Sequence, residues 1–70
     1  MITTHHLEAL RETIDYHSTV ASNSRSQATK LRAVSDPHGI AGSHDAADKF
    51  HGSISQTLEE LHHALTAEAH

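Results

Sequence analysis

Apolar and small residues recur at helical spacing along the first half of the chain. They are separated alternately by three and four positions, which places their side chains on one face of an α-helix. This first stripe is bulky at its ends and small or polar in its middle, and its members are Leu7, Leu10, Ile14, His17, Ala21, Ser24, Ala28 and Leu31. The pattern predicts a helix over about residues 4–34, with Lys30 and Arg32 in its last turn, where the helix dipole favours cations.

A second stripe with helical spacing occupies the C-terminal half. Its members are Ala47, Phe50, Ile54, Leu58, Leu61 and Leu65. We expect a helix over about residues 44–68. Ser43 or Asp45 is placed to cap its first turn, and Asp48 lies where the positive end of the helix dipole favours an acid.

Turn-forming residues separate the two stripes. Between Ser35 and Ser43 the chain carries its one proline, Pro37, and two of its three glycines, Gly39 and Gly42. Proline disfavours helical geometry in the residue before it, and a glycine inside a helix costs about 1 kcal/mol relative to alanine. A turn over about residues 35–43 is therefore expected.

The polar segment 22–27 leaves the continuity of the first helix open, because its serines and asparagine compete for backbone hydrogen bonds. An antiparallel hairpin that closes around residue 39 would place a small residue opposite a large one at each level. The expected pairs are Ala28 with Phe50, Ser24 with Ile54, and Ala21 with Leu58. This complementarity favours a continuous helix.

Two such helices form only one layer, whereas a stable domain needs a second layer over its apolar faces. Below about 80 residues, a core rarely supplies more than a few kcal/mol without disulfides, metal or oligomerisation. We predict an all-α fold, a single domain over residues 1–70, in which an antiparallel two-helix hairpin completes a four-helix bundle with an identical or different partner chain. The predicted partner interface comprises Leu7, Leu10, Ile14, Ala21, Ala28, Leu31, Phe50, Ile54, Leu58, Leu61 and Leu65.

The charge balance argues against a nucleic-acid partner. Lys and Arg number 5 against 9 Asp and Glu, which gives a net charge of −4 with neutral histidines, whereas phosphate-tracking surfaces are basic. The first ten residues lack a basic segment followed by an apolar run, and no stretch approaches about 18 consecutive apolar residues. We expect neither a general secretory signal nor a membrane span.

Motifs for covalent or cofactor chemistry are missing from the sequence. It has no cysteine, no Gly-x-Ser-x-Gly motif and no glycine-rich phosphate loop. Large apolar side chains are also too few to surround a deep pocket. We expect no enzymatic activity and no cofactor.

Nine histidines raise the alternative of a metal-binding or ferritin-like helical protein. Three pairs have the acid-x-x-His spacing of helical di-metal sites: Asp48 with His51, Glu59 with His62, and Glu60 with His63. At about 100° per residue, both glutamates and His63 point more than about 110° from the centre of the second stripe, so no buried metal site is expected. A looser cluster at the open end of the hairpin, which could bind zinc or nickel, contains His5, His6, His62, His63 and His70.

His17 is the one histidine on the first stripe, and a hairpin closing around residue 39 places it near Leu61. A polar residue at such a position can fix register or oligomeric state. A buried neutral imidazole is also destabilised when acid protonates it. We therefore identify His17 as a candidate pH-sensitive residue, with a hydrogen-bonded core histidine as the alternative.

The turn and the start of the second predicted helix resemble a known family. The segment Gly39-Ile40-Ala41-Gly42, followed by Ala46-Ala47 and Phe50, is similar to the same region of the WXG superfamily of small helical type VII secretion proteins, most of all to its EspC-like branch. Where that family carries Trp-x-Gly, this chain has Pro37-His38-Gly39. The segment 64–70 also lacks the tyrosine of the family's Tyr-x-x-x-Asp/Glu export signal.

The resemblance implies a role in bacterial type VII export. A paired helical protein, such as a larger secreted effector, would then supply the export signal. This chain would act as a chaperone-like or targeting subunit, located in the cytoplasm before export and secreted with its partner. A homodimeric structural bundle without an export role is the remaining alternative.

Overall fold

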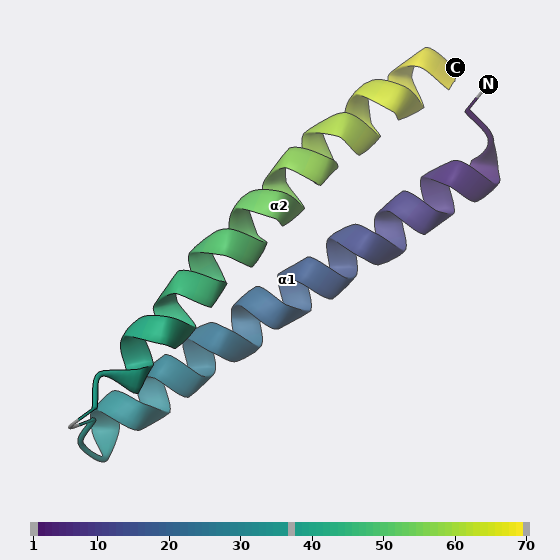
Figure 1. Ribbon diagram of the computed structural model, residues 1–70. Helices are drawn as coiled ribbons and strands as arrows, with labels where there is room; N and C mark the ends of the chain where they lie inside the picture. Colours follow the sequence, from purple (N-terminus) through teal and green to yellow (C-terminus); the bar gives the residue numbers. More distant parts are fainter. Residues whose placement is uncertain (1, 37, 70) are drawn as a thin grey trace.

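Two long helices joined by a short turn make up the computed structural model, which describes residues 2–36 and 38–69. Helix α1 spans Thr4–Ala33 and α2 spans Ile40–Ala69, and each has 30 residues. They lie antiparallel, with both chain ends at the same end of the molecule (Figure 1). The described residues contain no strand, so the predicted all-α helical hairpin is confirmed.

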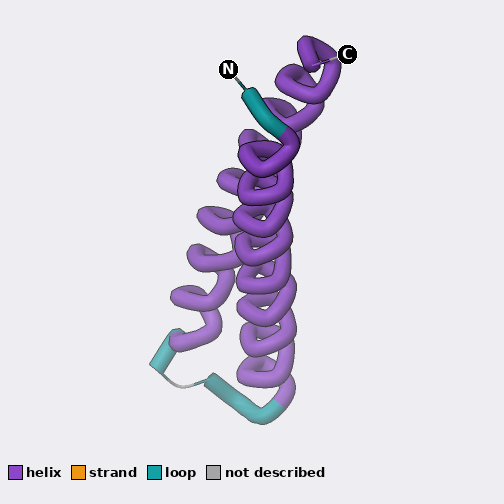
Figure 2. The backbone as a smooth tube through the Cα atoms, turned by 90° about the vertical axis from the view of Figure 1, so that its right-hand side faces the viewer, coloured by secondary structure: helices purple, strands orange, loops and turns teal. Residues whose placement is uncertain are grey.

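The hairpin is a single-layered rod of 52 × 15 × 13 Å. Seen from the side, the turn closes one end, and α2 extends past the start of α1 at the other (Figure 2). Each helix can therefore cover only one side of the other. Within the described residues, neither helix has an apolar stretch long enough to cross a membrane.

Helix α1 runs without a break through the polar segment 22–27. Of these six residues only Ser24 is buried against α2, and the other five are exposed. Polar side chains that point into water leave the backbone hydrogen bonds of the helix intact. Lys30 and Arg32 lie in its last turn as predicted, and at its start the Thr3 hydroxyl accepts a hydrogen bond from the His6 backbone in a capping box.

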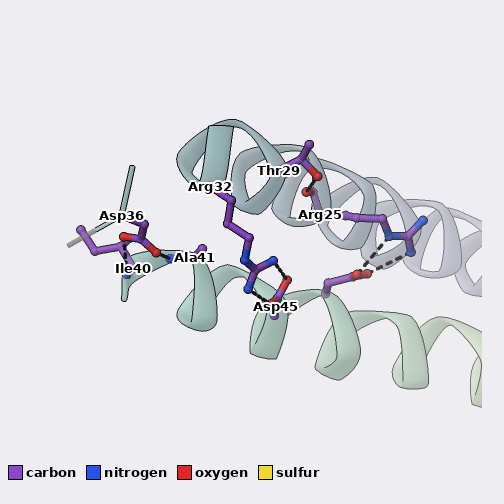
Figure 3. Close-up of polar contacts among 8 residues, drawn as sticks. Arg25, Thr29, Arg32, Asp36, Ile40, Ala41 and Asp45 are labelled. Carbon is purple, nitrogen blue, oxygen red and sulfur yellow. Dashed lines mark hydrogen bonds and ion pairs between the residues drawn. The ribbon is translucent and has the colours of Figure 1, made fainter. Parts of the chain in front are cut away.

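The turn is shorter than the sequence predicts, because α2 begins at Ile40 and Gly42 lies inside it. The Asp36 carboxylate accepts hydrogen bonds from the backbone N–H groups of Ile40 at 2.9 Å and Ala41 at 2.8 Å (Figure 3). The prediction that Ser43 or Asp45 caps this helix is therefore wrong. Gly39 has a φ of +68°, a left-handed conformation that glycine adopts without strain, while the predicted turn residue Pro37 lies outside the described residues.

The earlier start of α2 shifts the register between the helices. The Ser18 and Ser55 hydroxyls are 2.6 Å apart, and Ser55 also donates to the Ile14 carbonyl at 3.4 Å. The predicted opposition of small and large residues, with Ala21 at the level of Leu58, is therefore wrong. A hairpin that closes nearer to residue 36 than to residue 39 instead places small residues opposite small ones.

The contact between the helices is made mainly by small side chains. Among the described residues Ile14, at 2% exposure, is the one bulky side chain that is fully buried. The other buried residues are Ala21, Ser24, Ala28, Ala41 and Ser55. Alanine and serine allow two helices to approach closely, but they remove little apolar area from water. The hairpin thus has a narrow core.

We expect Asp36→Ala to destabilise the hairpin by about 1 kcal/mol, because two N–H groups at the start of α2 lose their acceptor. Chemical denaturation followed by circular dichroism measures this change. Asp15→Ala is the matched control, since Asp15 is exposed and its ion pair with Arg11 lies within one helix. Equal stability of the two variants would contradict the capping role of Asp36.

Candidate partner-binding surface

The bulky residues of α2 do not point at α1. Ser55 marks the side of α2 that contacts α1, and at about 100° per residue the second stripe is centred about 90° to one side of it. Phe50 is 62% exposed and Leu61 is 47% exposed, whereas Ile54, Leu58 and Leu65 are half-buried. The periodicity thus identified residues that share a face, but α1 covers only part of that face.

Three ion pairs join α1 to α2 on the side of Ser55 opposite to the second stripe. Arg11 binds Glu59 through two hydrogen bonds of 2.8 Å, and Arg25 binds Asp48 through two of 3.0 Å. Arg32 binds Asp45 in the same bidentate manner (Figure 3). The three carboxylates lie about 45° from Ser55, away from the second stripe.

The hairpin therefore has two unlike sides. The ion-paired face comprises Arg11, Arg25, Arg32, Asp45, Asp48 and Glu59. The apolar face comprises Val20 and Leu31 from α1, both half-buried, and from α2 Ala47, Phe50, Ile54, Leu58, Leu61 and Leu65. By helical geometry, Val20 and Leu31 lie on the side of α1 away from its three arginines.

A shallow groove runs along α2 beside Phe50. It is lined by Ser53, Ile54, Thr57 and Leu58, with Lys49 at its edge. A broader depression on the ion-paired face lies over Ala21, Gly52 and Ser55, where the small side chains of the two helices leave space. Only the first hollow combines an exposed aromatic ring with apolar walls.

Two of the arginines lower the pKa of the carboxylate that they bind, at Asp45 and Glu59. The hydrogen bonds from Arg32 lower the pKa of Asp45 below the ordinary aspartate value, and those from Arg11 lower the pKa of Glu59 in the same way. All three arginines also have raised pKa values, with the hydrogen bond to the carboxylate as the largest cause. The ion-paired face is thus held in its charged form at neutral pH.

His17 packs against His51, not near Leu61 as predicted. Their Nδ1 atoms are 2.7 Å apart and their rings stack with centroids 5.0 Å apart. Tyr16 and Phe50 make edge contacts to the two rings. A bond between two Nδ1 atoms requires one ring to donate and the other to accept, so two charged imidazoles are incompatible with it. This pairing depends on the register and has no signal in the sequence.

The carboxylates expected in metal-type pairs are engaged elsewhere. Asp48 binds Arg25 and Glu59 binds Arg11, and His51 contacts His17. Within residues 2–36 and 38–69 no three metal-ligating side chains come together. His70, from the predicted cluster at the open end, lies outside the described residues.

The residues predicted to contact a partner divide into three groups. Ile14, Ala21 and Ala28 are buried between α1 and α2, so they hold the hairpin together and are not free for another chain. Phe50 and Leu61 are exposed. The others, Leu7, Leu10, Leu31, Ile54, Leu58 and Leu65, are half-buried.

Comparison of the chain with models of known protein families, with curated proteins and with solved structures finds no match. The two faces of the hairpin are therefore the features that bear on its function.

We expect the contact between His17 and His51 to stabilise the hairpin, because it joins α1 to α2 through a hydrogen bond between the two Nδ1 atoms and a stacked pair of rings. A hydrogen bond of this kind contributes about 0.5–1.5 kcal/mol. His17→Ala should therefore lower the thermal midpoint at neutral pH. His63→Ala, at an exposed site, is the control and should leave the midpoint nearly unchanged. Equal midpoints for the two variants would contradict a stabilising role of this contact.

The hairpin is expected to lose stability in acid, below about pH 4. The folded-state pKa values of Asp45 and Glu59 are lowered, so their contribution is complete above the unfolded-state pKa and is lost as the pH falls through the folded-state value. Arg32→Gln should flatten the acid dependence of the unfolding free energy between about pH 5 and pH 3. Lys30→Gln removes an exposed charge at the end of the same helix and should leave that dependence unchanged.

Proposed function

We propose that the protein is a helical interaction module that docks through its apolar face onto another helical protein and completes a four-helix bundle. The observation that carries this proposal is the segregation of the two faces: the arginines and carboxylates pair on one side, and on the other side Phe50 and Leu61 are exposed among the half-buried residues of the same stripe. A face of this composition is what an interface core requires.

The energetics support a partner. The hairpin buries one bulky side chain completely among the described residues, and burial of a large apolar side chain contributes about 1.5–3 kcal/mol. Covering Phe50, Leu61 and the half-buried leucines would add a fraction of such a contribution for each side chain, in proportion to the area that is still exposed. A second layer of helices over the apolar face supplies that cover without any change in the hairpin itself.

The proposed setting is bacterial type VII export, and it rests on the resemblance to the WXG superfamily. Two features are consistent with it: the antiparallel hairpin of two long helices and the glycine turn, where Gly39 has a positive φ immediately before α2. In this setting the protein pairs with a helical effector that carries the export signal. The chain then acts as its chaperone-like or targeting subunit, cytoplasmic before export and secreted afterwards.

Substitution on the apolar face tests the proposal. Leu61→Asp would place a charge on the docking surface, and an unpaired charge buried at a helix contact is strongly unfavourable. Because Leu61 is 47% exposed in the hairpin, the variant should keep its helical circular dichroism and lose association, as measured by light scattering after size exclusion.

Gln56→Asp is the matched control, because Gln56 is exposed and borders the depression on the ion-paired face. This variant should associate like the wild-type protein. A wild-type chain that stays a stable helical monomer of 7.6 kDa would contradict the proposal.

A further inference from the structure

Four apolar residues of α2 are arranged symmetrically about Ile54. Phe50 and Leu58 lie four positions to either side of it, and Ala47 and Leu61 lie seven positions to either side. Ile54 is also at the middle of α2, which spans Ile40–Ala69. If this helix is turned end over end about Ile54, these four residues exchange positions in pairs, whereas Leu65 falls on the position of Ser43.

This symmetry is what a two-fold contact between identical helices requires. In such a contact, residue i of one chain meets residue j of the other, and j meets i. Ile54 would meet its own copy, Phe50 would meet Leu58, and Ala47 would meet Leu61. A small residue thus faces a large one at the outer level, and an aromatic ring faces an aliphatic side chain at the inner level.

The groove beside Phe50 fits the same arrangement. Its walls include Ile54 and Leu58, and the Phe50 ring of an antiparallel copy would arrive at the level of Leu58. Phe50 is 62% exposed in the isolated hairpin, so the ring is available for insertion. The projecting ring and the groove that would receive it lie on the same surface, as a self-complementary contact requires.

Charge and area also permit a second copy. None of the eight residues that make up the apolar face is charged, and Lys49 lies at the edge of its groove. The flank of the hairpin that carries the apolar face is two helices wide and measures about 45 by 20 Å, or about 900 Å², and the apolar residues from Ala47 to Leu65 occupy about 27 Å of its length along α2. A stable interface buries about 800 Å² on each partner.

We propose that the occupant of the apolar face is a second copy of this chain, packed with α2 antiparallel to α2 about a two-fold axis at Ile54. This inference rests on the proposed docking function and assigns the apolar face to an identical chain in place of the helical effector of the proposed export setting. The resulting four-helix assembly has its ion-paired faces outward and its bulky residues inside.

Single cysteines test this geometry, because the natural chain has none. In the antiparallel arrangement, residue 47 of one chain lies about 21 Å along the helix axis from residue 47 of the other. The same distance separates the two copies of residue 61, and neither pair is within reach of a disulfide. Oxidation of Ala47→Cys alone or Leu61→Cys alone should therefore give no cross-linked dimer. An equal mixture of the two should give one, with twice the 7.6 kDa chain mass.

Two controls accompany the cross-linking. Residue 56 lies close to the proposed two-fold axis along the length of α2, but its side chain is on the ion-paired side of the helix. Gln56→Cys should therefore not cross-link. Native mass spectrometry of the unsubstituted chain should show the dimer directly. Circular dichroism of each reduced variant verifies that the helices are intact before oxidation.

The outcomes separate this inference from the function on which it rests. Cross-linking of Ala47→Cys with itself means a parallel dimer, and a monomer with little helix means that a different chain is needed. Either result overturns the antiparallel arrangement about Ile54 and leaves the interaction function standing. A stable helical monomer, or cross-linking through Gln56→Cys, overturns both.

Discussion

The close contact of small side chains between α1 and α2 is the constraint on which the other features of the structure depend. Ala21, Ala28 and Ala41 are buried there together with Ser24 and Ser55. Alanine and serine bring two helices near each other and leave no room on the contact line for an aromatic ring or a row of leucines. The bulky residues of α2 are therefore displaced to one side.

Polar contacts determine which side this is. Each surface ion pair contributes little energy, but the pairs made by Arg11, Arg25 and Arg32 all lie on one flank, and two of them have carboxylate partners on the first half of α2. Rotating α2 to bring Phe50 inward would separate all of them. It would also break the Ser18–Ser55 bond in the middle of the contact. The polar network thus specifies a rotation that apolar burial within the hairpin alone would not favour.

With this arrangement the hairpin resembles one half of a four-helix bundle. The hairpin pairs its three arginines with its own carboxylates and caps its own helices, with Asp36 at the turn and Thr3 at the start of α1. Its apolar face runs along α2 and is bordered by the half-buried Val20 and Leu31. What the hairpin lacks is a second layer, and the proposed interaction function follows from that need.

The sequence alone determined the local features: two helices, their approximate extents and the residues that share each face, because helical periodicity and end signals act over one or two turns. It did not determine the length of the turn. The Asp36 carboxylate caps α2 at Ile40, so Gly42 lies inside the helix and not in the turn. Because α2 starts four residues earlier than predicted, the register between the two helices differs from the predicted one. His17 therefore lies beside His51, and Ala21 is not at the level of Leu58. Whether a stripe faces its own hairpin or a neighbour was likewise decided only in the tertiary structure, because periodicity records which side chains point together and contains no information about what covers them.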